Sequence, residues 1–198
     1  IVYKIGDRAL ITSDKLKTLK FDANTIKNIL SESKSSTGGK ILKQDLTVLK
    51  MLAQELLIMT KTKDKVTKYV NSMMVKTAPN LSTLVGSTIG ARLIAQAGSL
   101  AKLAKLSSSG IQILGAEKAL FRSMKTGSRP PKHGILFQHK YVHSAPKRLR
   151  GKIARTFSSK IAIAVRIDYF KGKFDKDLIT KLNDKVLQLL SKNNLKIT

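Results

Sequence analysis

The side chains best suited to chemistry are the eleven Lys and Arg residues between Lys118 and Arg155, a segment that contains no Asp or Glu. A run of one charge sign repels itself, and a polyanionic partner relieves that repulsion. Apolar residues such as Leu120, Phe121 and Met124 interrupt the run at a regular spacing that a disordered basic tail would lack. The segment therefore predicts a folded surface that binds the phosphates of a nucleic acid.

The cations follow a helical spacing twice, at i, i+4 and i+7, which places each set on one face of a helix. The two sets are Lys118, Arg122 and Lys125, then Arg148, Lys152 and Arg155. A loop over residues 126–134 (TGSRPPKHG) lies between them and carries Arg129, Lys132 and His133. Two basic helix faces joined by such a loop predict a cradle for RNA or DNA. Bent or looped RNA suits the Pro, His and Arg of the loop better than duplex DNA, because splayed bases stack on planar side chains.

Three histidines, His133, His139 and His143, lie within eleven residues of each other. No Cys, Asp or Glu accompanies them, so we expect no metal site. Each ring could instead stack on or hydrogen-bond to a base, or be buried and bonded to the backbone.

Catalysis has little support in this sequence. Residues 78–170 contain sixteen basic residues but only two acids, Glu117 and Asp168, and Glu117 already suits the first turn of a helix. No Gly-rich phosphate loop occurs, so we expect no cofactor and no enzymatic activity. The absence of Cys excludes disulfides. No apolar run reaches the ~18 residues that cross a bilayer, and a chain without Trp whose basic stretch is broken by Gly and Pro is a poor membrane binder.

The elements that must position these residues are predicted to be helices, which makes the fold all-α. Apolar residues recur at helical spacing from Ile41 to Thr77 without Gly or Pro, predicting a helix of about 35 residues whose apolar stripe needs a partner. Short helices are expected near residues 13–19 and after Asp22, followed by a loop over 31–39. Further helices are expected over residues 81–97, 100–106, 115–125, 146–168 and 174–190, with 139–146 irregular. Apolar residues alternate from Ile161 to Ile167, which also suits a strand, although the helical spacing of the apolar residues before them favours a helix.

The chain resembles the Nop domain family in an ordered set of motifs. They are Ala78-Pro79-Asn80-Leu81, Gly90-Ala91-Arg92-Leu93-Ile94, Ala97-Gly98-Ser99-Leu100, Gly115-Ala116-Glu117-Lys118-Ala119-Leu120-Phe121-Arg122, Gly151-Lys152-Ile153-Ala154-Arg155 and Ala164-Val165-Arg166-Ile167-Asp168. The match covers roughly residues 78–170, and its PPKHG and FQH forms look most like archaeal members. The resemblance implies a partial coiled-coil domain over residues 1–77 and a compact helical Nop domain with a C-terminal helix over 78–198.

The resemblance also implies a function. Such proteins are non-catalytic scaffolds of box C/D ribonucleoproteins that guide RNA 2′-O-methylation. Their partners are a box C/D guide RNA with a kink-turn, the ribosomal-protein-like subunit already bound to that kink-turn, and the methyltransferase fibrillarin. Fibrillarin is held by an N-terminal domain that we do not find in these residues, and the coiled coil joins two copies of the full-length protein. Residues 1–40 resemble the connection between the two coiled-coil helices.

Site residues follow from the resemblance and from charge. The resemblance implies RNA contacts for Gly115, Ala116, Glu117, Lys118, Arg122, His139, Lys152 and Arg155. Charge and position add Lys125, Arg129, Lys132, His133, Lys147, Arg148 and Arg150.

Three alternatives stay open: a splicing-type member of the same family that binds a small nuclear ribonucleoprotein, an RNA-modifying enzyme, and a general basic RNA-coating protein. The intact GAEKALFR string argues against the splicing type. The expected location is the cytoplasm for an archaeal protein and the nucleolus for a eukaryotic one.

Overall fold

The computed structural model describes residues 1–39 and 41–191, except for five side chains of the last helix, at 178, 179, 183, 186 and 190. Every regular element in these ranges is helical and none is a strand, so the prediction of an all-α fold is confirmed. The chain divides into two compact units, which we call unit 1 (Ile1–Val66) and unit 2 (Thr67–Thr198). No helix in the described ranges is long and apolar enough to cross a membrane.

Unit 1 begins with η1 (Arg8–Leu10), α1 (Ser13–Thr18) and α2 (Ala23–Ser35), and ends within the long helix α3 (Lys43–Thr77). Asp22 caps α2 as predicted, since its carboxylate accepts the Thr25 backbone N–H at 3.0 Å. The loop predicted from residue 31 is wrong in its first half, because α2 continues to Ser35. The Ser33 hydroxyl donates to the Leu30 carbonyl, so its hydrogen bond is made within the helix.

Helix α3 has 35 residues, which confirms the predicted long helix. Many of its apolar side chains are exposed, including those of Leu49, Leu52 and Leu56. A partner for this stripe stays a prediction, as does a domain boundary at residue 77.

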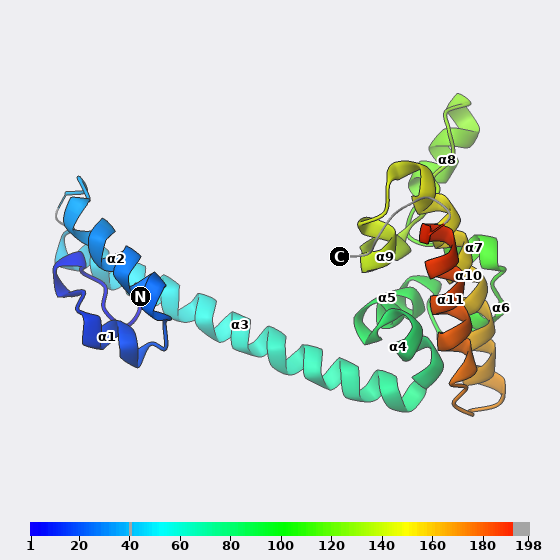
Figure 1. Ribbon diagram of the computed structural model, residues 1–198, viewed down its shortest axis with the longest axis horizontal. Helices are drawn as coiled ribbons and strands as arrows, with labels where there is room; N and C mark the ends of the chain where they lie inside the picture. Colours follow the sequence, from blue (N-terminus) through cyan, green and yellow to red (C-terminus); the bar gives the residue numbers. More distant parts are fainter. Residues whose placement is uncertain (40, 192–198) are drawn as a thin grey trace. The chain divides into compact units, whose positions relative to one another are not determined.

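Unit 2 is organised around one central helix, α10 (Lys147–Phe170). The elements before it are α4 (Pro79–Val85), α5 (Ser87–Ala97), α6 (Leu100–Lys105), α7 (Ser108–Ile113), α8 (Glu117–Thr126), η2 (Ile135–Gln138) and α9 (Lys140–His143), and α11 (Asp177–Ser191) follows it. Helix α10 packs against α4, α6, α7, α9 and α11 (Figure 1). It buries Leu149, Ile153, Phe157, Ile161 and Val165 on successive turns. A helix covered by neighbours in this way can hold residues of its remaining exposed stripe in fixed positions.

Two features of unit 2 differ from the sequence predictions. The helix expected over residues 81–97 is two helices, because Gly86 takes a φ of +82° that ends α4 and starts α5. The segment 139–146, expected to be irregular, contains the short helix α9, which the His139 side chain caps.

The alternation from Ile161 to Ile167 forms helix and not strand. Ile161 and Val165 are buried four residues apart, whereas Ile163 is 41% exposed. In α11, Leu182 is buried as predicted and Leu189 is half-buried, while the side chains of Leu178 and Val186 lie outside the described residues.

The start of α4 is fixed to the end of α10 by one buried carboxylate. Asp168 accepts the backbone N–H groups of Asn80 at 3.0 Å and Leu81 at 2.9 Å, and the Asn80 side-chain amide at 2.7 Å. Asp168 therefore supplies the acceptors that the first turn of α4 lacks within its own helix. The carboxylate that the sequence offered as one of two possible catalytic acids has a structural role.

Candidate nucleic-acid interface

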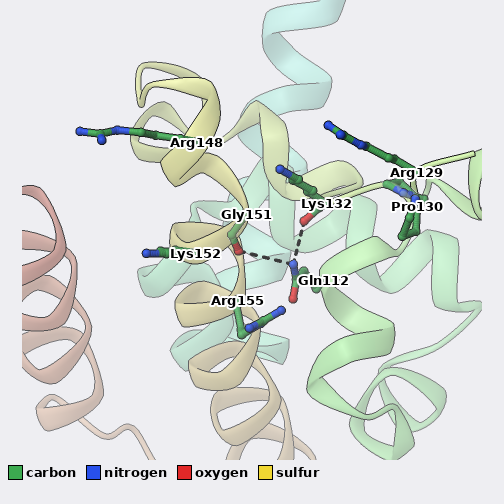
Figure 2. Close-up of a pocket in the computed structure, with 9 residues that line it drawn as sticks. Gln112, Arg129, Pro130, Lys132, Arg148, Gly151, Lys152 and Arg155 are labelled. Atoms are coloured by element: carbon green, nitrogen blue, oxygen red, sulfur yellow. Dashed lines mark hydrogen bonds between the residues drawn. The ribbon is translucent and has the colours of Figure 1, made fainter. Parts of the chain in front are cut away.

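A basic hollow of about 490 Å³ lies between α10, α7 and the loop over residues 127–134. We call it the first hollow. Its lining residues are Gln112, Arg129, Pro130, Pro131, Lys132, Arg148, Gly151, Lys152 and Arg155. Figure 2 shows Arg148, Lys152 and Arg155 projecting from α10, with Arg129 and Lys132 on the facing loop. The structure thus brings together five of the predicted cations, from two segments separated in the sequence.

The loop is held in place by backbone hydrogen bonds and by Gln112. The Gln112 side-chain amide, on a residue 9% exposed, donates to the Lys132 carbonyl at 2.7 Å and reaches the Gly151 carbonyl at 3.5 Å (Figure 2). The Gly134 N–H donates to the Gln112 carbonyl at 3.0 Å, and the Ile135 N–H donates to the Leu114 carbonyl at 2.8 Å. Gln112 therefore connects the loop to α10 at the base of the first hollow.

Gly151 allows the loop to approach α10 closely. A Cβ atom at this position would lie 3.3 Å from both Cβ and Cδ of Lys132. Any longer side chain would displace Lys132 or fill the space between the two sets of cations. Glycine in a helix interior costs about 1 kcal/mol relative to Ala, so this glycine is better explained by packing than by helix formation.

The charged ends of the five cations of the first hollow have no partner within the described part of the chain. In the part of the chain that the structure describes, none of them forms an ion pair with a carboxylate or donates a side-chain hydrogen bond. Arg129, Lys132, Arg148, Lys152 and Arg155 are all exposed. Unpaired charges of one sign on the same surface repel each other, so a bound anion would stabilise the site.

Arg150 differs from these cations, although the sequence placed it with them. Its Nε donates to the Ala145 carbonyl at 2.8 Å and a terminal nitrogen donates to the His143 carbonyl at 3.2 Å. Its guanidinium also lies 5.2 Å from the centre of the Phe137 ring. Arg150 therefore stabilises the segment before α10, and charge spacing alone could not separate it from Arg148.

The basic face of α8 does not line the first hollow. Lys118, Arg122 and Lys125 are exposed on a helix that projects from the rest of unit 2 (Figure 1). Phe121 and Met124 on the same helix are 62% and 73% exposed. The structure thus does not bring the two basic helix faces together in one hollow, and a cradle that uses both faces stays a prediction. Lys147, at the start of α10, is exposed and also lies outside the lining.

The GAEK segment forms the turn that starts α8. The Glu117 carboxylate accepts the Gly115 backbone N–H at 2.7 Å and the Gln96 side-chain amide at 3.3 Å. The bond from Gly115 lowers the pKa of Glu117 below its usual value. Glu117 is therefore held as an anion by the protein itself, and Ala116 serves as the N-terminal cap position of α8.

The three histidines lie in aromatic contacts near α9. The His133 ring stacks on Phe137 with centroids 4.8 Å apart, and the His139 ring lies 4.3 Å from that of Phe157. The ring nitrogen Nδ1 of His139 accepts the Tyr141 N–H at 3.3 Å. Burial lowers the pKa of His139 to about 4, and burial together with the Arg150 charge lowers that of His133. His139 is thus neutral at pH 7, and this half-buried residue bonds to the backbone through its ring.

Sequence reasoning placed the loop prolines in the site but missed the parts played by Gln112 and Gly151. A neutral amide and a helical glycine carry no charge signal, and only their place beside Lys132 reveals what they do. Among the described residues, no group of three or more His, Asp or Glu side chains could hold a metal ion.

Comparison with known proteins gives a consistent family. The Nop family model, described as "snoRNA binding domain, fibrillarin", matches residues 1–190. An uncharacterized NOP5 family protein of Methanocaldococcus jannaschii is 38% identical over 192 residues, covering 97% of this chain and 46% of the relative. Human nucleolar protein 56 is 39% identical over 190 residues, covering 94% of this chain and 32% of the relative. The chain thus spans less than half the length of these relatives.

A solved structure agrees with this result. The crystal structure of a fibrillarin/Nop5p complex matches with a TM-score of 0.60 and 28% identity, covering 89% of this chain and 65% of that chain.

Proposed function

The chain belongs to the Nop family of snoRNA-binding domains, and from this premise we propose that it is a non-catalytic scaffold of a box C/D ribonucleoprotein. In this proposal it recognises kink-turn RNA together with the ribosomal-protein-like subunit bound to that RNA. The observation that carries the proposal is the first hollow, which is lined by five exposed cations that form no ion pair among the described residues.

Electrostatic capture is the first part of the mechanism. If each of the five cations contacts one phosphate, the slope of log affinity against log salt is about −3.5 to −4.5, at roughly 0.7 to 0.9 per contact. Affinity would then fall about 100- to 500-fold between 50 and 200 mM salt. A site of this kind binds strongly at low salt but does not by itself choose one RNA sequence.

Shape supplies the second part of the mechanism. The loop bearing Arg129 and Lys132 is fixed by Gln112, and Gly151 sets its distance from α10. Cations carried on two segments whose separation is fixed favour an RNA backbone bent to match them over an extended one. The neutral ring of His133 follows Lys132 in the chain and could stack on an unpaired base. His139 packs against Phe157, which lies half a turn around α10 from Arg148, so a base contact by His139 would be made on another side of this helix.

The wider assembly is part of the proposal. The fibrillarin named with the related Nop5p structure is the expected methyltransferase partner, reached through the longer protein, and two copies would join through the coiled-coil part. The protein would act in the nucleolus of a eukaryote, as the names of its nucleolar relatives suggest, or in the cytoplasm of an archaeon.

A paired binding measurement tests the proposal. The chain is titrated against a kink-turn RNA alone and against the same RNA already bound by its ribosomal-protein-like subunit, with a straight duplex of equal length as control. We expect the preassembled complex to bind most tightly, because it offers both the bent backbone and a protein surface. Equal affinity for all three would indicate a general RNA-coating protein and contradict the proposal.

A second measurement tests the absence of catalysis. The chain is incubated with RNA and S-adenosylmethionine without any partner protein, and methylated nucleotides are measured. No methyl transfer is expected, because the basic surface offers no base or nucleophile with a suitable partner. Methylation by the chain alone would establish an RNA-modifying enzyme instead.

A further inference from the structure

A second basic hollow, of about 530 Å³, lies between α10 and α11. It is lined by Lys152, Arg155 and Lys160 with Thr156 and Ser159 on α10, and by Lys185 and Leu189 on α11. Lys152 and Arg155 line both hollows, so the two basic surfaces are continuous. Figure 2 shows Lys152 pointing away from the first hollow toward the side where α11 runs.

We propose that this second hollow binds the RNA strand that continues from the kink-turn, with Lys160 and Lys185 as further phosphate-binding residues. The inference rests on the proposed function, since it extends the same RNA-binding surface. The strand would pass along α10 from the level of Arg148 to that of Lys160. Twelve helical rises of 1.5 Å give a length of about 18 Å. A strand advancing about 3.4 Å per nucleotide places on the order of five phosphates along that length.

The charges favour a polyanion at this position. Four cations line the second hollow, and the described lining contains no carboxylate. In the described part of the chain, neither Lys160 nor Lys185 forms an ion pair or donates a side-chain hydrogen bond. They resemble the cations of the first hollow in this respect and differ from Arg150 and Arg166, whose guanidinium groups bond to backbone carbonyls.

The polar character of the lining favours RNA over an acidic protein segment. Thr156 donates its hydroxyl hydrogen to the Lys152 carbonyl at 3.2 Å, and Ser159 donates to the Thr156 carbonyl at 2.9 Å. Both oxygens keep lone pairs that can accept a hydrogen bond from a ribose 2′-OH. A docked protein segment would instead require an apolar anchoring surface, and Leu189 is the apolar side chain that the described lining supplies.

The test compares two charge-neutralising double variants of the chain. The first is Lys160→Gln with Lys185→Gln, which removes the two cations that line the second hollow but not the first. The matched control is Lys171→Gln with Lys181→Gln, two exposed lysines on the same part of unit 2 that do not line it. Each is titrated against the preassembled kink-turn complex, made with RNA that ends at the kink-turn or that carries a single-stranded extension of about ten nucleotides at its 5′ or its 3′ end.

We expect one extension to steepen the salt slope by about 1.4, two contacts at roughly 0.7 each for a single strand. Wild type and the control variant should show this gain, and the Lys160/Lys185 variant should lose it while binding the unextended RNA as wild type does. Equal slopes for extended and unextended RNA in wild type would overturn the inference and leave the proposed function standing. An equal loss by the Lys160/Lys185 variant on every RNA would also overturn it, since that result indicates a general effect of net charge.

Two further outcomes are separable. If wild type fails to bind the unextended preassembled complex at 50 mM salt, the proposed function fails first. If a glutamate-rich peptide displaces the extension from wild type at equal concentration, with no effect on the Lys160/Lys185 variant, the second hollow is an acidic-peptide site and the inference is overturned.

Discussion

Arg148 and Arg150 lie two residues apart on α10, and we predict that replacing each by Gln separates RNA binding from folding. Arg148 is exposed and lines the first hollow. Arg150 donates to the carbonyls of Ala145 and His143 and lies against the Phe137 ring. Both substitutions remove one positive charge and keep a side chain of moderate length, so each serves as the control for the other.

The magnitudes follow from these contacts. A charged donor bonded to a carbonyl contributes about 1.5–3 kcal/mol, and one of the two Arg150 bonds is exposed and weaker. Contact with the ring adds about 0.5–1 kcal/mol. Arg150→Gln should therefore lower the free energy of unfolding by about 2–4 kcal/mol. For a unit of this size that corresponds to a fall in Tm of about 7–15 °C.

Arg148→Gln should leave the Tm nearly unchanged, within about 0.5 kcal/mol of stability. Loss of one phosphate contact reduces the salt slope by about 0.7–0.9, which at 0.15 M salt weakens binding about 4- to 5-fold. Arg150→Gln, measured well below its Tm, should retain RNA affinity to within about 2-fold.

Thermal unfolding followed by circular dichroism gives the two Tm values, and titration of the preassembled kink-turn complex at several salt concentrations gives affinity and slope. The reasoning is refuted if Arg150→Gln leaves the Tm unchanged while lowering the salt slope. It is equally refuted if Arg148→Gln lowers the Tm by several degrees or leaves RNA binding intact.

Three further predictions concern other parts of unit 2. Asp168→Asn replaces an acceptor at the start of α4 by a donor and should cost about 3 kcal/mol in urea unfolding, whereas the exposed Asp64→Asn should cost little. The pKa of His139, about 4, lies below the ~6.5 of the unfolded chain, so the unfolded state binds more protons and the free energy of unfolding falls as the pH drops from about 6.5 to about 4. In urea titrations across this range, His139→Asn should reduce this dependence of the unfolding free energy on pH. An unaltered dependence would exclude His139 as its cause. Gly151→Leu should displace Lys132 and weaken RNA binding by about 5-fold or more, as the loss of at least one phosphate contact requires, with retained helicity as the folding control.

The sequence was sufficient for features that depend on local periodicity and on composition. The 35-residue helix α3 follows from an apolar spacing without Gly or Pro, and the Asp22 cap follows from a side chain that reaches the backbone three residues on. The family also follows from the sequence alone, because its motifs are recognised by their residues and their order along the chain, without any knowledge of contacts. The acid-free run from Lys118 to Arg155 likewise predicts a polyanion-binding surface from charge alone, and this prediction is part of the proposed function.

Only the tertiary structure decided which cations line the same hollow. Arg148 and Arg150 are equivalent in charge and in local pattern, but their orientation differs by about 200° around α10, at 100° per residue. One side chain therefore faces solvent beside the loop, and the other reaches carbonyls that precede the helix. Lys118, Arg122 and Lys125 show the same helical spacing as the α10 set, yet α8 does not pack beside α10 and they fall outside the first hollow. Spacing along a chain determines which residues share a helix face, whereas the neighbour of that face is determined by long-range packing, here by Gln112 and Gly151 holding one loop against α10.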